Sequence, residues 1–297
     1  MSSPDGSAGV RGRYRIKHVS RFGYSSPVRR CTMSLCLQPL ESPGQRLLDF
    51  SVETTPQAGF TTETDPFGNT RHVLSLHRDH DRLEVVSNCA VEVDGPPTLP
   101  ERLRCDAWDR VRSMGNDPRW WGFTGPSPMA RPSAALRDFV TELGVEPGTD
   151  PLADLLRLSA ALHDTFEYTP GATTVDSPVD DILASRKGVC QDYTHVLLAI
   201  ARSWGIPTRY VSGYLYVTDE TGRGSAFGSA THAWAESRLP DVGWIGIDPT
   251  NRTVSDERYV RIAVGRDYRD VPPTRGVIEG GGDSHLEVDV RMTPVAG

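Results

Sequence analysis

Short runs that alternate polar with apolar residues, rich in β-branched and aromatic side chains, dominate the first third of the chain. Such runs predict strands that bury one face. They cover residues 14–19, 46–52, 71–77 and 83–93. Turn signals separate them, for example the Asp-Pro-Phe-Gly-Asn segment at 65–69. The pattern therefore predicts an antiparallel β-sandwich-like module over residues 13–110.

Two irregular segments flank this module. The small polar residues 1–12 are expected to be disordered. Residues 111–132 contain several prolines and glycines and are expected to form a loop-rich bridge. The adjacent Trp120 and Trp121 in this bridge are expected to pack across the junction of the two halves of the chain, with a ligand platform as the alternative.

From residue 133 onward the apolar residues follow a helical period. Ser133 suits the N-cap of a helix that ends at Gly144, and Asp150 suits the N-cap of a second helix with Pro151 as its first residue. A third helical segment covers residues 179–185.

A longer helix begins near Cys190, after a glycine turn, and ends at Gly205. Beyond it the period changes to that of strands at residues 208–217, 230–239 and 243–248. A Gly/Ser-rich hairpin at 218–229 is expected to join the first two strands, and the tight turn at 239–243 makes the last two pair antiparallel. Residues 133–297 are therefore predicted to form one helix-and-strand domain with C-terminal strands, and the whole chain is of the α+β class.

Composition and charge narrow the range of partners. The formal net charge is −7 and the arginines are scattered, which argues against nucleic acid or an anionic membrane as the main partner. The five cysteines are an odd number and form no C-x-x-C pair, which disfavours a disulfide framework. Neither a signal-peptide pattern nor an apolar stretch of membrane-spanning length is visible. We therefore expect a cytoplasmic protein with reduced thiols; its oligomeric state is not predicted.

Three residues have the order and context needed for nucleophilic chemistry. Cys190 stands at the start of a helix, where backbone N–H groups are unpaired and a thiolate is favoured. His232 lies 42 residues downstream in a strand-like run, and Asp248 ends the next strand 16 residues later. If the turn at 239–243 pairs these strands, Asp248 returns beside His232 and fixes its tautomer.

Each of these residues also has a purely structural explanation. A single histidine in a strand is more often a core or surface residue, Asp248 before Pro249 suits a turn, and Cys190 could be a small buried residue. From spacing alone, the catalytic and the structural interpretations remain equally open.

The segments around these three residues resemble the signature blocks of the bacterial transglutaminase-like superfamily. The blocks are Gly188-Val189-Cys190-Gln191-Asp192-Tyr193, His232-Ala233-Trp234-Ala235-Glu236 and Gly246-Ile247-Asp248-Pro249-Thr250-Asn251. Segments 168–174, 208–214, 264–268 and 271–273 also look like that family, and the β-rich first part is similar to the N-terminal region of many bacterial members.

The resemblance implies a papain-related core in which a cysteine-bearing helix packs on an antiparallel sheet. It implies Cys190 as nucleophile, His232 as general base and acid, and Asp248 as the residue that orients His232. Three further residues are weaker candidates for the oxyanion site or the pocket: Tyr168, Gln191 and Trp234.

No cofactor or metal is predicted. The histidines His72, His77 and His80 match no established zinc spacing, and neither nucleotide fingerprints nor an EF-hand-like loop are visible. His195, on the helix that begins at Cys190, points away from that residue and is expected to be a packing or surface residue.

The expected activity is attack on a peptide or amide carbonyl through a thioester on Cys190. Hydrolysis is favoured because water needs no second binding site, which makes a peptidase or amidase acting on a peptide, protein or small amide. Acyl transfer to an amine, as in a transglutaminase or an amide-forming enzyme, is the alternative. A binding or scaffold protein without turnover is the second alternative, although the presence of Cys190, His232 and Asp248 disfavours it.

Overall fold

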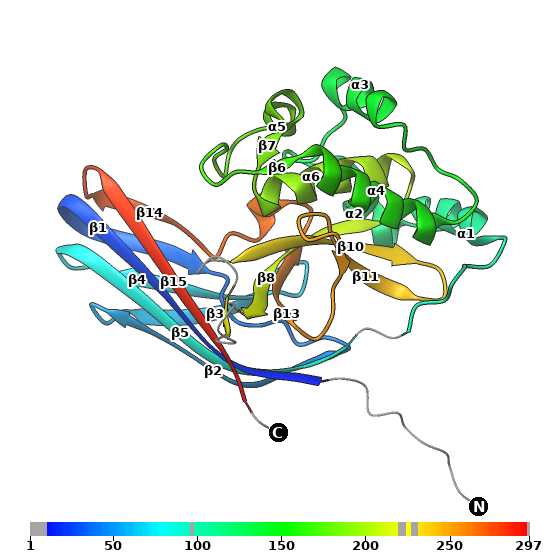
Figure 1. Ribbon diagram of the computed structural model, residues 1–297. Coiled ribbons are helices and arrows are strands. Elements are labelled where there is room, and N and C mark those ends of the chain that lie inside the picture. The colour runs from blue at the N-terminus through cyan, green and yellow to red at the C-terminus, as the bar shows by residue number, and fades with distance from the viewer. Residues whose placement is uncertain (1–10, 96–97, 219–223, 227–230, 296–297) are drawn as a thin grey trace, which may run out of the picture.

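The computed structural model describes residues 11–95, 98–218, 224–226 and 231–295 (Figure 1). The segment 1–10, expected to be disordered, and most of the expected hairpin 218–229 lie outside these residues. The helices gather on one side of the molecule and the long N-terminal strands on the other, with a second sheet between them (Figure 1).

The N-terminal part is a curled antiparallel sheet, as the alternating pattern predicts. Its path runs in the order β2-β5-β1-β4-β3. The strands are β1 (Arg11–Leu35), β2 (Gln45–Thr55), β3 (Gly59–Thr64), β4 (Thr70–Leu76) and β5 (His80–Asp94). Arg11 and Gly12, expected to be disordered, instead begin β1, because Arg11 pairs with Asp94 of β5 and its Nε lies 2.8 Å from the Asp94 carboxylate.

The last two strands complete this N-terminal sheet. Both β14 (Thr274–Gly280) and β15 (Ser284–Pro294) pair antiparallel with β1. The 25-residue β1 is long enough to pair with β15 along its first half, from Tyr14, and with β14 along its second half, up to Leu35. The C-terminal strands expected within the domain of residues 133–297 therefore belong structurally to the N-terminal sheet.

Short helices, rather than loops alone, make up much of the bridge. They are α1 (Ala107–Gly115), the 3-10 helix η1 (Pro118–Trp120) and α2 (Trp121–Thr124). Trp120 packs edge-on against Trp244, with ring centroids 5.9 Å apart, so this side chain links the bridge to the second sheet. Trp121 is 60% exposed and does not share that role.

The principal helices begin and end where the capping residues predict. They are α3 (Ala134–Leu143), α4 (Pro151–Thr165), α5 (Val179–Ser185) and α6 (Cys190–Ser203). Ser133 Oγ accepts a 3.0 Å hydrogen bond from the Leu136 N–H, and Asp150 Oδ1 accepts one of 2.9 Å from the Leu152 N–H. Gly144 ends α3 with a φ of 65°, which favours glycine. No helix among the described residues is long and apolar enough to cross a membrane.

The second sheet has the order β12-β11-β10-β8-β13. Its strands are β8 (Thr208–Thr218), β10 (His232–Leu239), β11 (Gly243–Asp248), β12 (Thr253–Val254) and β13 (Tyr259–Gly265), and the short β9 (Gly224–Ala226) pairs with β8. β10 and β11 form the predicted antiparallel hairpin, with Asp241 and Gly243 at positive φ in its turn. A two-residue parallel pair joins β6 (Glu167–Tyr168) to β7 (Lys187–Gly188), just before α6.

Both faces of the second sheet are covered. Ala233 and Ala235 of β10 belong to the main core with the apolar residues of α6. Trp234, which points to the opposite face, packs with Tyr259, Leu40 and Phe67 in a separate cluster on the side of the N-terminal sheet. The sheet is therefore held between the helices and the N-terminal part.

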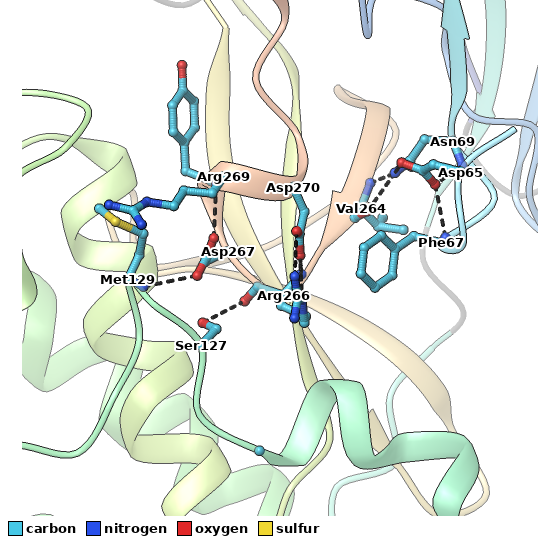
Figure 2. A network of polar contacts seen from close by, with 12 residues as sticks. Asp65, Phe67, Asn69, Ser127, Met129, Val264, Arg266, Asp267, Arg269 and Asp270 are labelled. Carbon is cyan, nitrogen blue, oxygen red and sulfur yellow. Dashed lines mark hydrogen bonds and ion pairs between the residues drawn. The ribbon is translucent and has the colours of Figure 1, made fainter. Parts of the chain in front are cut away.

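Polar contacts fix the two parts to each other (Figure 2). The Asn69 side chain donates to the Val264 carbonyl and accepts from the Val264 N–H, both at 2.8 Å, so the 65–69 turn is tied to β13. Asp267 accepts hydrogen bonds from the Met129 and Arg269 N–H groups, which ties the bridge to the segment after β13. These contacts set the position of β13 and, through its pairing with β8, of the second sheet.

Candidate active site

The turn before α6 fixes the position of Cys190. Val189 is extended, with φ −118° and ψ 179°, and its N–H donates a 2.8 Å hydrogen bond to Asp192 Oδ2. A Cβ at Gly188 would lie 2.7 Å from Ile182 Cδ1 and 2.8 Å from Asp192 Oδ2, so any larger residue there would displace these side chains. Cys190 is thus the first residue of α6 and is partly exposed.

Two polar side chains of α6 hold residues 169–178, a segment that lies beside the start of the helix. Asp192 Oδ2 also accepts a 2.6 Å hydrogen bond from Thr173 Oγ1, and Gln191 Nε2 donates to the Val175 carbonyl at 3.0 Å. Burial raises the pKa of Asp192, although the bonds from Thr173 and Val189 act in the opposite direction. Gln191, predicted as a pocket residue, is therefore buried and holds the 169–178 segment beside Cys190.

His232 and Asp248 come together as the hairpin predicts. His232 is the first residue of β10 and Asp248 the last residue of β11. His232 Nε2 lies 2.7 Å from Asp248 Oδ2, and both side chains are completely buried. The hydrogen bond leaves Nδ1 as the ring nitrogen that can exchange a proton elsewhere.

The carboxylate of Asp248 accepts hydrogen bonds from several donors. Oδ2 accepts from Asn251 Nδ2 at 2.7 Å and from the Tyr259 hydroxyl at 2.9 Å, in addition to His232. Oδ1 accepts from the Thr250 and Asn251 N–H groups at 2.9 and 3.2 Å. Burial alone would raise the pKa of Asp248, but the bond and charge of His232, with Asn251 and Tyr259, hold it below its usual value.

The electrostatics of His232 favour its charged form. Burial lowers its pKa, but the hydrogen bonds to Asp248 and to the Cys190 side chain outweigh burial and raise it to about 10. The ring is thus an imidazolium at neutral pH, placed between a carboxylate and a thiol. An imidazolium beside a thiol stabilises the thiolate, which is the nucleophilic form.

Tyr168 and Trp234 differ in burial. Tyr168, in β6, is 42% exposed, and burial raises the pKa of its phenol to about 12, with smaller contributions from Cys190 and Asp248. Its hydroxyl is therefore protonated at neutral pH and near the thiol. The Trp234 ring is stacked against His232, with centroids 6.2 Å apart, and is fully buried, so it supports the imidazole from the core side.

The remaining histidines take structural positions. His195 is buried and its Nε2 accepts a hydrogen bond from the Tyr268 N–H, in line with a packing role. His72 and His80 are buried in the N-terminal sheet. Over the part of the chain that the structure describes, no three His, Cys, Asp or Glu side chains gather in a group that could hold a metal ion.

Sequence reasoning missed two donors to Asp248. Asn251 lies three residues after Asp248, and this short separation in the sequence could have indicated the contact. Tyr259 lies on β13, two strands beyond β10 in the sheet order, and only the sheet pairing brings it to Asp248. No local pattern indicates such a contact.

Comparisons with known proteins agree with this fold. The model of the transglutaminase-like superfamily matches residues 138–249, and that of the bacterial transglutaminase-like N-terminal region matches residues 14–92. An uncharacterized protein of Mycobacterium tuberculosis is 30% identical over an alignment of 309 positions, which covers 96% of this chain and 94% of that protein. A protein-glutamine gamma-glutamyltransferase of Pseudomonas aeruginosa is 32% identical over 170 residues, covering 52% of this chain and 24% of that protein.

Among solved structures, a candidate cysteine protease from Cytophaga hutchinsonii has the same fold. The TM-score is 0.74 at 19% identity, over 97% of this chain and 92% of that one. The family models and the mycobacterial relative together define a transglutaminase-like protein. The chain belongs to the transglutaminase-like superfamily and carries the N-terminal region found in its bacterial members.

Proposed function

We propose that this protein is a thiol hydrolase that attacks a peptide or amide carbonyl with Cys190, using His232 as base and acid and Asp248 to orient His232. The observation that carries the proposal is the buried His232–Asp248 pair, 2.7 Å long, whose imidazole also bonds to the Cys190 side chain. Thiol acyl transfer needs a nucleophile, a base and a group that orients the base.

The first half-reaction uses the two ring nitrogens of His232 differently. Nδ1 already carries the proton from Cys190 in a resting thiolate–imidazolium pair, while the Nε2 proton remains in the hydrogen bond to Asp248. The thiolate sulfur then bonds to the carbonyl carbon, and the carbonyl electron pair moves to oxygen. When the tetrahedral intermediate collapses, the C–N bond breaks, the leaving amine takes the proton from Nδ1, and a thioester remains on Cys190.

Two donors are suited to the oxyanion of that intermediate. The Cys190 backbone N–H, at the start of α6, has no acceptor within its own helix. The Tyr168 phenol, held protonated, lies near the thiol and contributes a second donor. The positive end of the α6 dipole adds to the stabilisation of negative charge at this point.

Water completes the reaction in the proposed hydrolase, because it needs no second binding site. His232 Nδ1 takes a proton from water, the hydroxide oxygen bonds to the acyl carbon, and the thiol leaves with the proton returned by His232. An amine acceptor is the second candidate. It is favoured by the similarity of the chain to the Pseudomonas aeruginosa protein-glutamine gamma-glutamyltransferase.

Incubation with glutamine-containing peptides, with and without a primary amine, tests the proposal by mass spectrometry of the products. Cleaved or deamidated peptide that is unaffected by the amine supports hydrolysis, and an amine conjugate supports the second candidate. Cys105→Ala, which removes the exposed cysteine outside the site, is the matched control and should behave as wild type. Equal turnover by Cys190→Ala and wild type would contradict both.

We further propose that the protein works with reduced thiols, as expected in the cytoplasm. All five cysteines are free, and burial raises the pKa of Cys36 to about 11 and of Cys89 to about 12, which keeps those two thiols unreactive.

A further inference from the structure

A cavity of about 420 Å³ lies on the face of the second sheet that is turned toward the N-terminal part. Its walls are formed by this face of β8, β10, β11 and β13, by the loop after β1 and by the end of β5. The polar and aromatic side chains of the lining include Ser42, Arg209, Glu236, Arg238, Trp244 and Arg261.

One buried carboxylate organises the inner wall. Glu236 is 1% exposed and accepts from Arg209 Nε and Nη2 at 2.9 and 2.6 Å and from Arg261 Nε at 2.5 Å. Burial would raise the pKa of Glu236, but the charges and hydrogen bonds of Arg261 and Arg209 lower it to about 2. Glu236 is therefore a fixed negative charge that offsets one of two guanidinium charges.

A third guanidinium has no carboxylate. Arg238 lies between two indoles, 4.8 Å from the Trp120 ring centroid and 5.9 Å from that of Trp244, and makes no ion pair with any residue that the structure describes. The Arg209 guanidinium also lies over the Trp244 ring, 4.2 Å from its centroid. Burial, followed by the charges of Arg209 and Arg119, lowers the pKa of Arg238, so positive charges crowd each other here.

The other carboxylates that line the cavity pair with arginines that do not line it. Asp94 pairs with Arg11 at 2.8 Å and Asp256 pairs with Arg258 at 2.7 Å, and neither arginine lines the cavity. Three guanidinium charges of the wall thus face the single carboxylate Glu236, which leaves an excess of two positive charges.

Two residues that line the cavity each have a hydrogen-bond donor without an acceptor among the described residues. Arg261 Nη1 and Ser42 Oγ are both buried, and neither has a hydrogen-bond partner among the described residues. A buried donor without an acceptor is costly, and more so when the group is charged. Excess positive charge and unsatisfied donors at one cavity point to the same kind of ligand.

We propose that this cavity is a binding site for a small oxyanion, a carboxylate or a phosphate, held by Arg238, Arg261 and Ser42. Guanidinium groups bind both anions through paired N–H donors, and cavities of roughly 300–1,000 Å³ are the usual size for small ligands. The site is separate from Cys190. Glu236 stands four residues from His232 on β10, about 13 Å along the strand, with the buried Trp234 between them.

Titration calorimetry of the full chain in a chloride buffer, with inorganic phosphate and with succinate as probes, tests the proposal. We expect one binding event per chain with a Kd of about 1 mM or below for at least one probe. Binding of phosphate alone or of succinate alone supports the site and identifies the preferred anion. Absence of binding by both probes would overturn it.

Variants locate the binding. Arg238→Gln should weaken Kd by about tenfold or more, and Ser42→Ala, which disturbs the wall least, by about threefold or more. Arg112→Gln, on the exposed surface of α1, is the matched control and should bind like wild type. Unchanged Kd in both cavity variants, or an equal loss in Arg112→Gln, would overturn the site. Because Ser42→Ala keeps every charge, it answers the question even if Arg238→Gln does not fold.

Discussion

His232 Nε2 and Asp248 Oδ2 lie 2.7 Å apart, and the two residues mark the start of β10 and the end of β11. The register of the hairpin, with Ala235 opposite Ile247, brings them together at one end of the sheet. In the proposed mechanism, the same bond leaves Nδ1 as the ring nitrogen that carries the Cys190 proton. The proposed chemistry thus depends on the turn at 239–243 as much as on the three side chains.

Asp248→Asn should lower kcat by about 10²–10⁴-fold, because an amide at this position favours the wrong imidazole tautomer. Peptide or amide turnover measured at saturating substrate checks the effect. Asp164→Asn, which removes an exposed carboxylate paired with Arg252, is the control and should retain wild-type kcat. If Asp248→Asn keeps its kcat, another residue orients His232.

Tyr259→Phe should reduce kcat by about tenfold and move the acid limb of the pH–rate profile upward. The variant loses one hydrogen bond to the Asp248 carboxylate, worth about 1.5–3 kcal/mol for a charged acceptor, and the pKa of Asp248 rises accordingly. Tyr24→Phe, in β1 of the N-terminal sheet, is the matched control. A loss of activity without movement of the acid limb would assign Tyr259 a packing role only.

Cys190 should react with iodoacetamide at pH 5.5–6.5 at least about tenfold faster than Cys105, because the His232 imidazolium stabilises the thiolate. Cys105 is the exposed reference within the same chain, and the buried Cys36 and Cys89 should remain unmodified. Peptide mapping by mass spectrometry at several pH values gives each rate. Equal rates for Cys190 and Cys105 below pH 7 would refute the activated thiol.

The His232–Asp248 pair should make stability depend on pH in a defined direction. The pKa of His232 is raised from 6.5 to about 10 on folding, so its contribution is complete below pH 6.5 and is lost as the pH rises toward 10. The pKa of Asp248 is lowered, so its contribution is present above its usual range near 3.8 and is lost as the pH falls through the folded value.

Urea unfolding of wild type and Asp248→Asn at pH 5–9.5 measures this contribution. The difference in the free energy of unfolding should be about 2 kcal/mol or more near pH 6 and shrink toward pH 9.5. A difference that stays constant over that range would show that the pair does not titrate as described.

Local patterns in the sequence were sufficient for the elements that carry the site. Ser133 and Asp150 cap the helices that they were expected to cap, and the 239–243 turn makes the predicted hairpin. Such signals depend on neighbouring residues, so they can be read from a short window. The family resemblance then supplied the fold.

Contacts between distant segments could not be predicted in this way. The pairing of β15 with β1 joins Pro294 to Tyr14, and no local pattern encodes such a register. The contact from Tyr259 to Asp248 and the Arg261–Glu236 pair likewise depend on the order of strands in the second sheet. The expected disorder at residues 11 and 12 was wrong because both residues pair with β5 and Arg11 forms an ion pair with Asp94.

Intact-mass spectrometry of the protein quenched in acid during turnover of an amide or ester substrate tests the central claim most directly. The proposed mechanism predicts a wild-type adduct with the mass of the acyl group, mapped to Cys190 and released by hydroxylamine, and no adduct in Cys190→Ala that is folded by circular dichroism. Turnover by the wild-type protein with no acyl adduct, or an adduct that persists in Cys190→Ala, would contradict the assignment of Cys190 as the nucleophile.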